Sequence, residues 1–124
     1  MFEHELTDSE LLVMKAVWAT EEAMSIQGIT AKVNWMYKKD WAKQTVSVFL
    51  GRIVKRGFLR SERKGRHFFY YPTVSEDEYA KKEIVKCVDM WCNGRADILI
   101  ATLAKARTLN DKEKAKLRTL IDSM

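Results

Sequence analysis

Proline and cysteine are both scarce in this sequence. The 124 residues include one proline, Pro72, and two cysteines, Cys87 and Cys92. A single proline leaves helices uninterrupted over most of the chain. Two cysteines do not make the disulfide framework of a small secreted domain, and no cluster of cysteine or histidine near them predicts a zinc site. We expect two reduced thiols, and a redox-sensing or metal-sensing role for the pair is the alternative.

The sequence also lacks membrane-targeting segments and catalytic motifs. No stretch approaches the roughly 20 apolar residues of a transmembrane helix. The first residues lack the basic start and the apolar run of a secretory signal. The sequence has no HExxH motif, P-loop or glycine-rich dinucleotide motif, and His4 and His67 are isolated. These absences predict a cytoplasmic protein without membrane insertion, cofactor or metal, and not an enzyme.

Positive charge is abundant, and most of it lies in one quarter of the sequence. Residues 36–66 contain ten basic and two acidic residues, a net charge of +8. Residues 1–35 carry two basic and six acidic residues, net −4, and residues 67–124 carry ten basic and nine acidic residues, net +1. A local positive field attracts phosphate backbones and releases counterions on binding. The distribution favours a nucleic acid as partner, and an ordinary solvated face is the alternative.

The spacing of apolar residues and several capping motifs predict six helices. Thr7-Asp-Ser-Glu10 and Ser75-Glu-Asp-Glu78 are capping boxes, in which side chains bond the free amides of a helix start. Ser25 and Asp40 are further N-cap candidates, and Gly57 follows a helix where a left-handed residue is needed. The expected helices span 8–19, 26–37, 42–56, 76–92, 95–106 and a last segment that starts near Asn110.

A different pattern follows the third expected helix. Phe58–Arg63 and Arg66–Tyr71 have the composition of strands, and Lys64-Gly65 between them indicates a tight turn. Pro72 ends the second strand. Three helices followed by a basic hairpin is the element order of a winged helix-turn-helix. We therefore predict a mainly α fold that contains this unit.

The third expected helix has the two faces that a helix in the major groove of DNA needs. Val46, Phe49, Leu50 and Ile53 form a stripe to be buried, and short side chains lie opposite. Glutamine can bond adenine, serine and threonine can bond bases or phosphates, and valine can touch a thymine methyl group. The predicted DNA-binding residues are Lys43, Gln44, Thr45, Ser47, Val48, Arg52, Arg63, Lys64 and Arg66, with Lys55 and Arg56 as further phosphate contacts.

The aromatic residues occur at helical or strand spacing, which is typical of core positions. Stacking on the bases of a single strand is the alternative for them. They are Trp18, Trp35, Trp41, Phe68, Phe69, Tyr70 and Tyr71.

The last three helices have little globular body to pack against, and three short helices alone have a small core. We expect them to dimerise through their apolar faces, and folding back on the first domain as a monomer is the alternative. The predicted domains are a winged-helix DNA-binding domain over 1–73 and a helical dimerisation domain over 74–124. The predicted dimer residues are Trp91, Ile98, Leu99, Leu103, Leu117, Leu120 and Ile121.

Several runs of the sequence resemble the penicillinase-repressor family, which includes a copper-responsive branch. They are Leu6–Glu10, Lys39-Asp-Trp41, Gln44-Thr-Val46, Leu50–Leu59 and Tyr70–Ser75. The resemblance covers nearly the whole chain. It implies a homodimeric repressor that binds a palindromic operator in double-stranded DNA.

The resemblance also implies which residues face DNA. Third-helix positions 44, 45, 47, 48 and 52 correspond to residues of the family that face DNA, and the wing around 63–66 corresponds to a backbone contact. Thr45 and Arg52 match the residue types of the β-lactam repressors. The residues at 44, 47 and 48 differ from the lysine, arginine and threonine found there, which predicts a different operator sequence.

The resemblance bears on release of the repressor as well. β-Lactam-responsive members, which regulate antibiotic resistance, are cleaved at an Asn-Phe bond by a sensor-controlled protease. That bond corresponds to about Thr102-Leu103 here, and the Asn-Phe pair is absent. Copper-responsive members carry a C-terminal cysteine cluster that this sequence lacks. We expect release by an inducing signal such as proteolysis in the C-terminal domain, with Thr102 and Leu103 as the candidate region and cleavage at a different bond as the alternative. A winged-helix module that recognises an acidic protein is the alternative function.

Overall fold

The computed structural model describes residues 6–124, so residues 1–5, with His4 among them, lie outside the described part. The chain divides into two compact units, one that ends at Glu83 and one that runs from Ile84 to Met124. We call them the first unit and the second unit. The division falls inside helix α4 (Glu76–Trp91), later than the boundary between 73 and 74 that the sequence suggests.

The first helix, α1 (Asp8–Trp18), begins at the predicted capping box. The Glu10 amide donates to Thr7 Oγ1 at 3.2 Å, and the Thr7 amide donates to Glu10 Oε1 at 3.0 Å. Two amides at the helix start are therefore bonded by side chains. Val13 and Val17, on the same side of the helix as Glu10, are buried.

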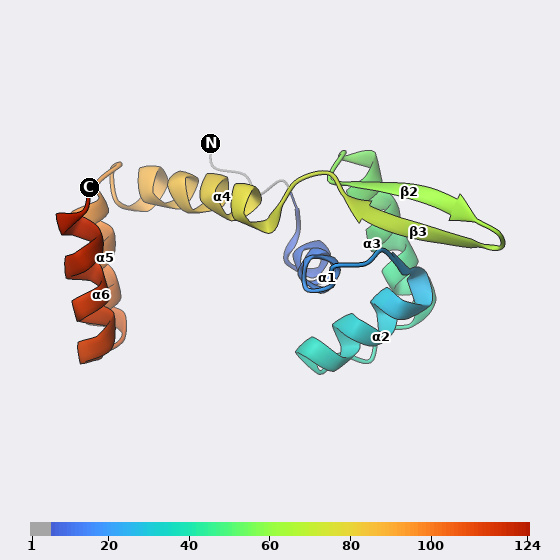
Figure 1. The fold of residues 1–124 in the computed structure, drawn as a ribbon, viewed down its shortest axis with the longest axis horizontal. Coiled ribbons are helices and arrows are strands. Elements are labelled where there is room, and N and C mark those ends of the chain that lie inside the picture. The colour runs from blue at the N-terminus through green and yellow to red at the C-terminus, as the bar shows by residue number, and fades with distance from the viewer. Residues whose placement is uncertain (1–5) are drawn as a thin grey trace. The chain divides into compact units, whose positions relative to one another are not determined.

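Helices α2 (Ile26–Tyr37) and α3 (Lys43–Lys55) complete the trio that packs together (Figure 1). The prediction that Asp40 caps α3 is wrong, because the N-cap is Ala42 and no side chain bonds the helix start. Lys38 takes a left-handed conformation with a φ of 53° at the end of α2. The chain returns to helical geometry only after Ala42, which leaves Asp40 in the turn.

Apolar side chains from the three helices form one core in the first unit. The stripe predicted for α3 is confirmed, because Val46, Leu50 and Ile53 are fully buried and Phe49 is half-buried. Ile29 and Val33 of α2 are fully buried in the same cluster. Burial on this side fixes which side of α3 faces outward.

The predicted hairpin consists of β2 (Leu59–Lys64) and β3 (His67–Pro72), which pair antiparallel. Its turn is Gly65-Arg66, one residue later than the predicted Lys64-Gly65. Gly65 has a φ of 65°, and a two-residue turn of type II′ needs a positive φ at its first position. Glycine meets that requirement most easily, so the turn starts at Gly65.

A third strand, β1 (Met24–Ser25), was not predicted from the sequence. It pairs antiparallel with β3, where Met24 lies opposite Tyr70 and Ser25 opposite Phe69, so the strand order is β1-β3-β2. Two residues are too few to form an alternating pattern that a sequence can reveal. The strand attaches the base of the hairpin to the start of α2.

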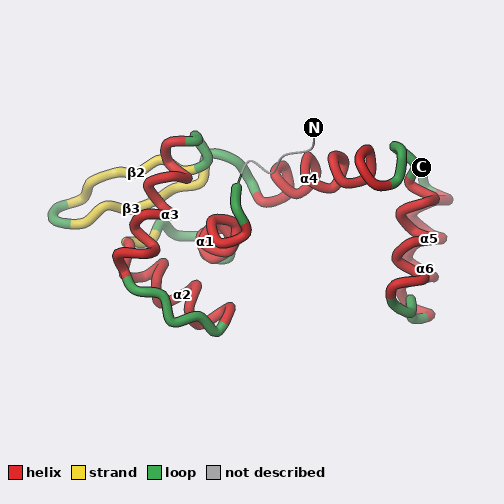
Figure 2. Tube along the Cα trace, turned by 180° about the vertical axis from the view of Figure 1, so that it is seen from behind, coloured by secondary structure: helices red, strands yellow, loops and turns green. Residues whose placement is uncertain are grey.

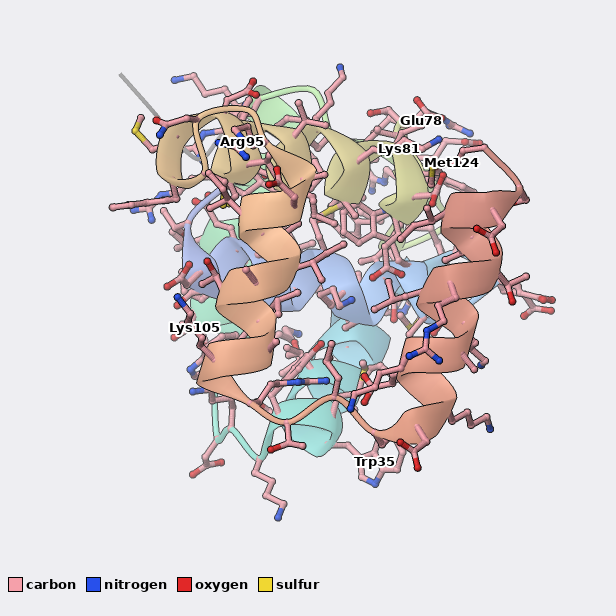
Figure 3. The ribbon with its side chains drawn as sticks, turned by 90° about the vertical axis from the view of Figure 1, so that its left-hand side faces the viewer. Trp35, Glu78, Lys81, Arg95, Lys105 and Met124 are labelled. Atoms are coloured by element: carbon pink, nitrogen blue, oxygen red, sulfur yellow. The ribbon has the colours of Figure 1, made fainter. Side chains whose placement is uncertain are left out.

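The second unit contains the end of α4, then α5 (Ala96–Ala106) and α6 (Asp111–Asp122). Asn93 and Gly94, with φ of 52° and 73°, end the α4 segment as predicted. Figure 3 shows α5 and α6 as an antiparallel pair, and Figure 2 shows that the described part of this unit is helical. Of residues 84–124, all of which are described, Cys92 alone is buried.

One carboxylate is enclosed in the core of the first unit. The Glu10 side chain is fully buried, and its Oε1 accepts a hydrogen bond from Arg56 Nη1 at 2.6 Å. Its Oε2 has no hydrogen-bond partner among residues 6–124. The pair joins the start of α1 to the residue that ends α3, so an ion pair holds these two helices together.

We predict that Arg56→Ala lowers the free energy of unfolding by about 2 kcal/mol, because it leaves the buried Glu10 carboxylate without its counterion. Arg52→Ala, one turn earlier on the exposed side, should change it by no more than about 0.5 kcal/mol. Adding Glu10→Gln to Arg56→Ala removes the buried charge and should recover part of the loss. Urea denaturation of the four proteins measures this, and equal stability of the two arginine variants would contradict it.

Candidate nucleic-acid interface

The outward side of α3 carries the residues that the sequence assigns to DNA. Lys43, Gln44, Thr45, Ser47, Val48 and Arg52 are all exposed. The helix contains no acidic residue, and Gly51 leaves open space on its exposed side. The middle of this exposed side therefore carries uncharged side chains, and the basic side chains of Lys43 and Arg52 flank them.

An asparagine holds the turn that leads into α3. Asn34 Nδ2 donates to the Trp41 carbonyl oxygen at 3.0 Å, and the Trp41 amide donates to Asn34 Oδ1 at 3.0 Å. The Trp41 ring packs at 5.2 Å from the ring of Phe49. These contacts fix the direction in which α3 begins. Sequence reasoning missed Asn34, since its partner lies seven residues away in a segment without periodicity.

The hairpin begins directly after α3 and projects away from the helices (Figure 1). Arg60 and Lys64 of β2 lie on the face of the hairpin that also carries Tyr71, because the register pairs Arg60 with Tyr71 and side chains alternate along a strand. The Arg60 guanidinium is 4.2 Å from the Tyr71 ring centroid, and Lys64 Nζ is 5.6 Å from it. This face is a basic surface supported by an aromatic ring.

Neighbouring groups set the charge of the hairpin. The hydrogen bond to Tyr71 raises the pKa of Lys64, so this lysine stays cationic. The hydrogen bond from Arg60 lowers the pKa of Glu62, which keeps that carboxylate ionised. At the tip, Arg63 Nε donates to the Gly65 carbonyl oxygen at 3.1 Å, and Arg66 is exposed in the turn. The hairpin therefore keeps a net positive tip.

Two sequence predictions about basic and aromatic residues are corrected by the structure. Arg56 was predicted to contact a DNA phosphate, but its guanidinium donates a hydrogen bond to the buried carboxylate of Glu10. Trp35 and Phe68 were expected in the core, but Trp35 lies on the outer side of α2 and is 78% exposed, and Phe68 is 50% exposed. The apolar stripe of α2 is formed by Ile29 and Val33, which leaves Trp35 on the opposite side.

Within residues 6–124 no helix combines the length and the apolar character that crossing a membrane requires. The same described residues contain no group of three or more histidine, cysteine, aspartate or glutamate side chains placed to hold a metal ion. Cys87 and Cys92 are free thiols, the first half-buried and the second buried.

Three packed helices, a short strand and a basic hairpin define a winged helix-turn-helix protein. The sequence profile of the family described as penicillinase repressor matches residues 6–123. The chain belongs to this family, which consists of transcriptional repressors and not of enzymes.

Individual relatives agree with that assignment. A 16.5 kDa protein from Latilactobacillus sakei is 31% identical over 118 residues, which cover 95% of this chain and 79% of that protein. The penicillinase repressor of Bacillus licheniformis is 22% identical over 118 residues, or 95% of this chain and 90% of the repressor. The solution structure of the DNA binding domain of the repressor BlaI is 28% identical, with a TM-score of 0.52, and the match covers 60% of this chain and 88% of that domain.

We predict that Asn34→Ala lowers the free energy of unfolding by about 1–2 kcal/mol, because it leaves the amide and carbonyl groups of Trp41 without their partner. Gln27→Ala is the matched control, a polar side chain on the exposed side of the same helix. Urea denaturation compares the two variants. If Asn34→Ala is no less stable than Gln27→Ala, the proposed clamp does not position α3.

Proposed function

We propose that this chain is a transcriptional repressor that binds a palindromic operator in double-stranded DNA as a homodimer. The observation that carries the proposal is the exposed side of α3, which combines short polar side chains with flanking basic residues and lacks acidic residues. A helix enters the major groove with such a side toward the base edges. A repressor of this kind acts in the cytoplasm, where bacterial DNA lies.

The residues divide into two roles by chemistry. Gln44, Thr45, Ser47 and Val48 have side chains that can discriminate base edges through hydrogen bonds or a methyl contact. The cationic residues contact phosphates, which supplies affinity for any duplex and sets the register of the protein on it. These phosphate contacts are Lys43, Arg52, Arg63, Lys64 and Arg66.

The start of α3 supports a phosphate contact for a second reason. No side chain caps this helix, and its first turn has no acidic residue. The first amides of a helix point along its axis without partners, and the helix dipole adds a partial positive charge there. Backbone amides near Lys43 are therefore suited to bind a phosphate oxygen.

The second unit supports the homodimer. Cys92 is the sole buried residue among the fully described residues 84–124, so an apolar core is lacking within the unit. A groove of about 440 Å³ between α5 and α6 is lined by Leu103, Leu109, Leu117 and Leu120 among others. Trp91 is 77% exposed, and Ile121 is exposed as well. A second copy would cover these apolar side chains, as the sequence predicts, and Ile98 and Leu99 are half-buried beside them.

Release of the repressor fits cleavage within α5. Thr102 and Leu103 are exposed, and Thr102 Oγ1 donates to the Ile98 carbonyl oxygen at 2.8 Å inside the helix. A protease needs an extended segment, so a turn of α5 must open before the bond can be cut. Cutting there removes most of the dimer surface. A sensor-controlled protease is thus the partner that this step requires.

We predict that in vitro selection with the purified chain yields a palindromic duplex. Lys64→Ala should weaken binding to the selected duplex and to other sequences by the same factor. It should also reduce the slope of log affinity against log salt concentration by about 1, the contribution of one phosphate contact. Gln44→Ala instead relaxes the preference at one position of each half-site, at a cost of about 1–3 kcal/mol for the preferred base. Fluorescence anisotropy at several salt concentrations measures both effects.

The matched control for the charge effect is Lys112→Ala, which removes an exposed lysine of α6 in the second unit. It should leave the affinity and the salt slope close to those of the unaltered chain. Failure to select any preferred sequence contradicts the repressor. Capture of an acidic protein partner, together with weak and salt-insensitive binding of DNA, would support the interaction module instead.

For the homodimer we predict that Leu117→Glu gives a monomer in sedimentation equilibrium, because a carboxylate in the apolar groove cannot be covered. Affinity for the palindrome should fall by about 10²-fold, since the two half-sites are then bound independently. Lys114→Glu, an exposed position of α6 outside the groove lining, should remain a dimer. A dimeric Leu117→Glu protein would place the dimer contact elsewhere.

A further inference from the structure

Trp35 carries a large exposed surface that neither the core nor the proposed DNA-binding residues use. Lys32 Nζ lies 5.6 Å from the centroid of its ring. Figure 3 shows Trp35 at the outer edge of the first unit. Tryptophan is enriched among the residues that carry the energy of protein contacts.

A pocket of about 310 Å³ lies elsewhere on the first unit, where the end of α1, β3 and the start of α4 meet. Trp18, Tyr70 and Tyr71 line it, and the exposed carboxylates of Glu21 and Glu22 stand at it too. No residue of α2 is in this lining, and Trp35 is exposed. A chain therefore does not fill its own pocket with its own Trp35.

The pocket is held in shape by contacts around Trp18. Trp18 Nε1 donates to the Val74 carbonyl oxygen at 2.9 Å, and the ring packs at 5.7 Å from the ring of Tyr79. Lys15 pairs with Glu76, which lines the same pocket. The aromatic wall is thus formed before a ligand arrives, and Glu21 and Glu22 give the opening a negative charge.

We propose that Trp35 of one copy inserts into this pocket of a second copy, with Lys32 beside Glu21 and Glu22. The two surfaces are complementary in charge, and both are aromatic. The contact joins two different patches of the same chain, so it is distinct from the dimer contact of the second unit and can link one dimer to the next. The proposal rests on the DNA-binding function proposed above.

The size of the contact determines where it acts. An aromatic side chain buries about 150–250 Å², which is far below the roughly 1,000 Å² of a stable interface. Two dimers free in solution should therefore not associate. Two dimers bound at neighbouring sites on one duplex face each other at an effective concentration of about 1 mM, at which a weak contact becomes occupied. The consequence is cooperative binding to adjacent operators.

The experiment uses the full chain and duplexes that carry one or two copies of the selected site. The spacing between copies is stepped through one helical turn, about 10 base pairs. We expect the second site to bind at least about fivefold more tightly once the first is filled, at one spacing within the turn. Trp35→Ala, Lys32→Glu and Glu21→Lys should each reduce this factor and leave single-site affinity unchanged. Gln27→Ala, on the exposed side of the same helix, should leave both quantities unchanged.

The charge-reversed pair supplies the decisive variant. Lys32→Glu combined with Glu21→Lys restores complementary charges between copies, so cooperativity should return at least in part. Normal single-site binding without cooperativity at any spacing overturns this inference and leaves the proposed function intact. Loss of single-site affinity in Trp35→Ala places the indole on DNA and also overturns it. Absence of binding to a single site contradicts the proposed function, and this inference with it.

Discussion

The burial of one side of α3 is the constraint on which the rest of the structure depends. Val46, Leu50 and Ile53 are fully buried against the first two helices, and this packing turns the opposite side of the helix to solvent. The Asn34 clamp fixes where the helix starts, and the pair of Glu10 and Arg56 fixes where it ends. The residues proposed to read DNA are thus held by a core that they do not belong to.

The sequence predicts most of this fold because the periodic features are strong. All six helices and both strands of the hairpin occur where apolar spacing and caps place them, within a residue or two. The features that escape prediction are contacts between distant residues or choices of local geometry. The two-residue strand β1, the Asn34 clamp and the Glu10–Arg56 pair each depend on partners that only the folded chain brings together. Trp35 was predicted to lie in the core and is exposed, because an aromatic residue on a helix need not belong to the buried stripe.

The two units differ in how their residues are buried, and this difference bears on function. The first unit has a continuous core and an ion pair in which one partner, the Glu10 carboxylate, is fully buried. The second unit exposes most of its apolar side chains, which the proposed homodimer would cover. In the proposed dimeric repressor, separating the two copies would abolish the affinity for a palindrome while the first unit of each copy stays folded. The inferred contact of Trp35 would add a further level, in which neighbouring dimers cooperate.

The proposed DNA-binding surface consists of the exposed side of α3 and the hairpin tip. Amide chemical shifts of the full chain, mapped by NMR during titration with the selected duplex, test it most directly. We expect the largest changes to cluster at residues 43–52 and 60–66, with little change along α1. Changes centred on the pocket beside Trp18, with α3 unaffected, would contradict it.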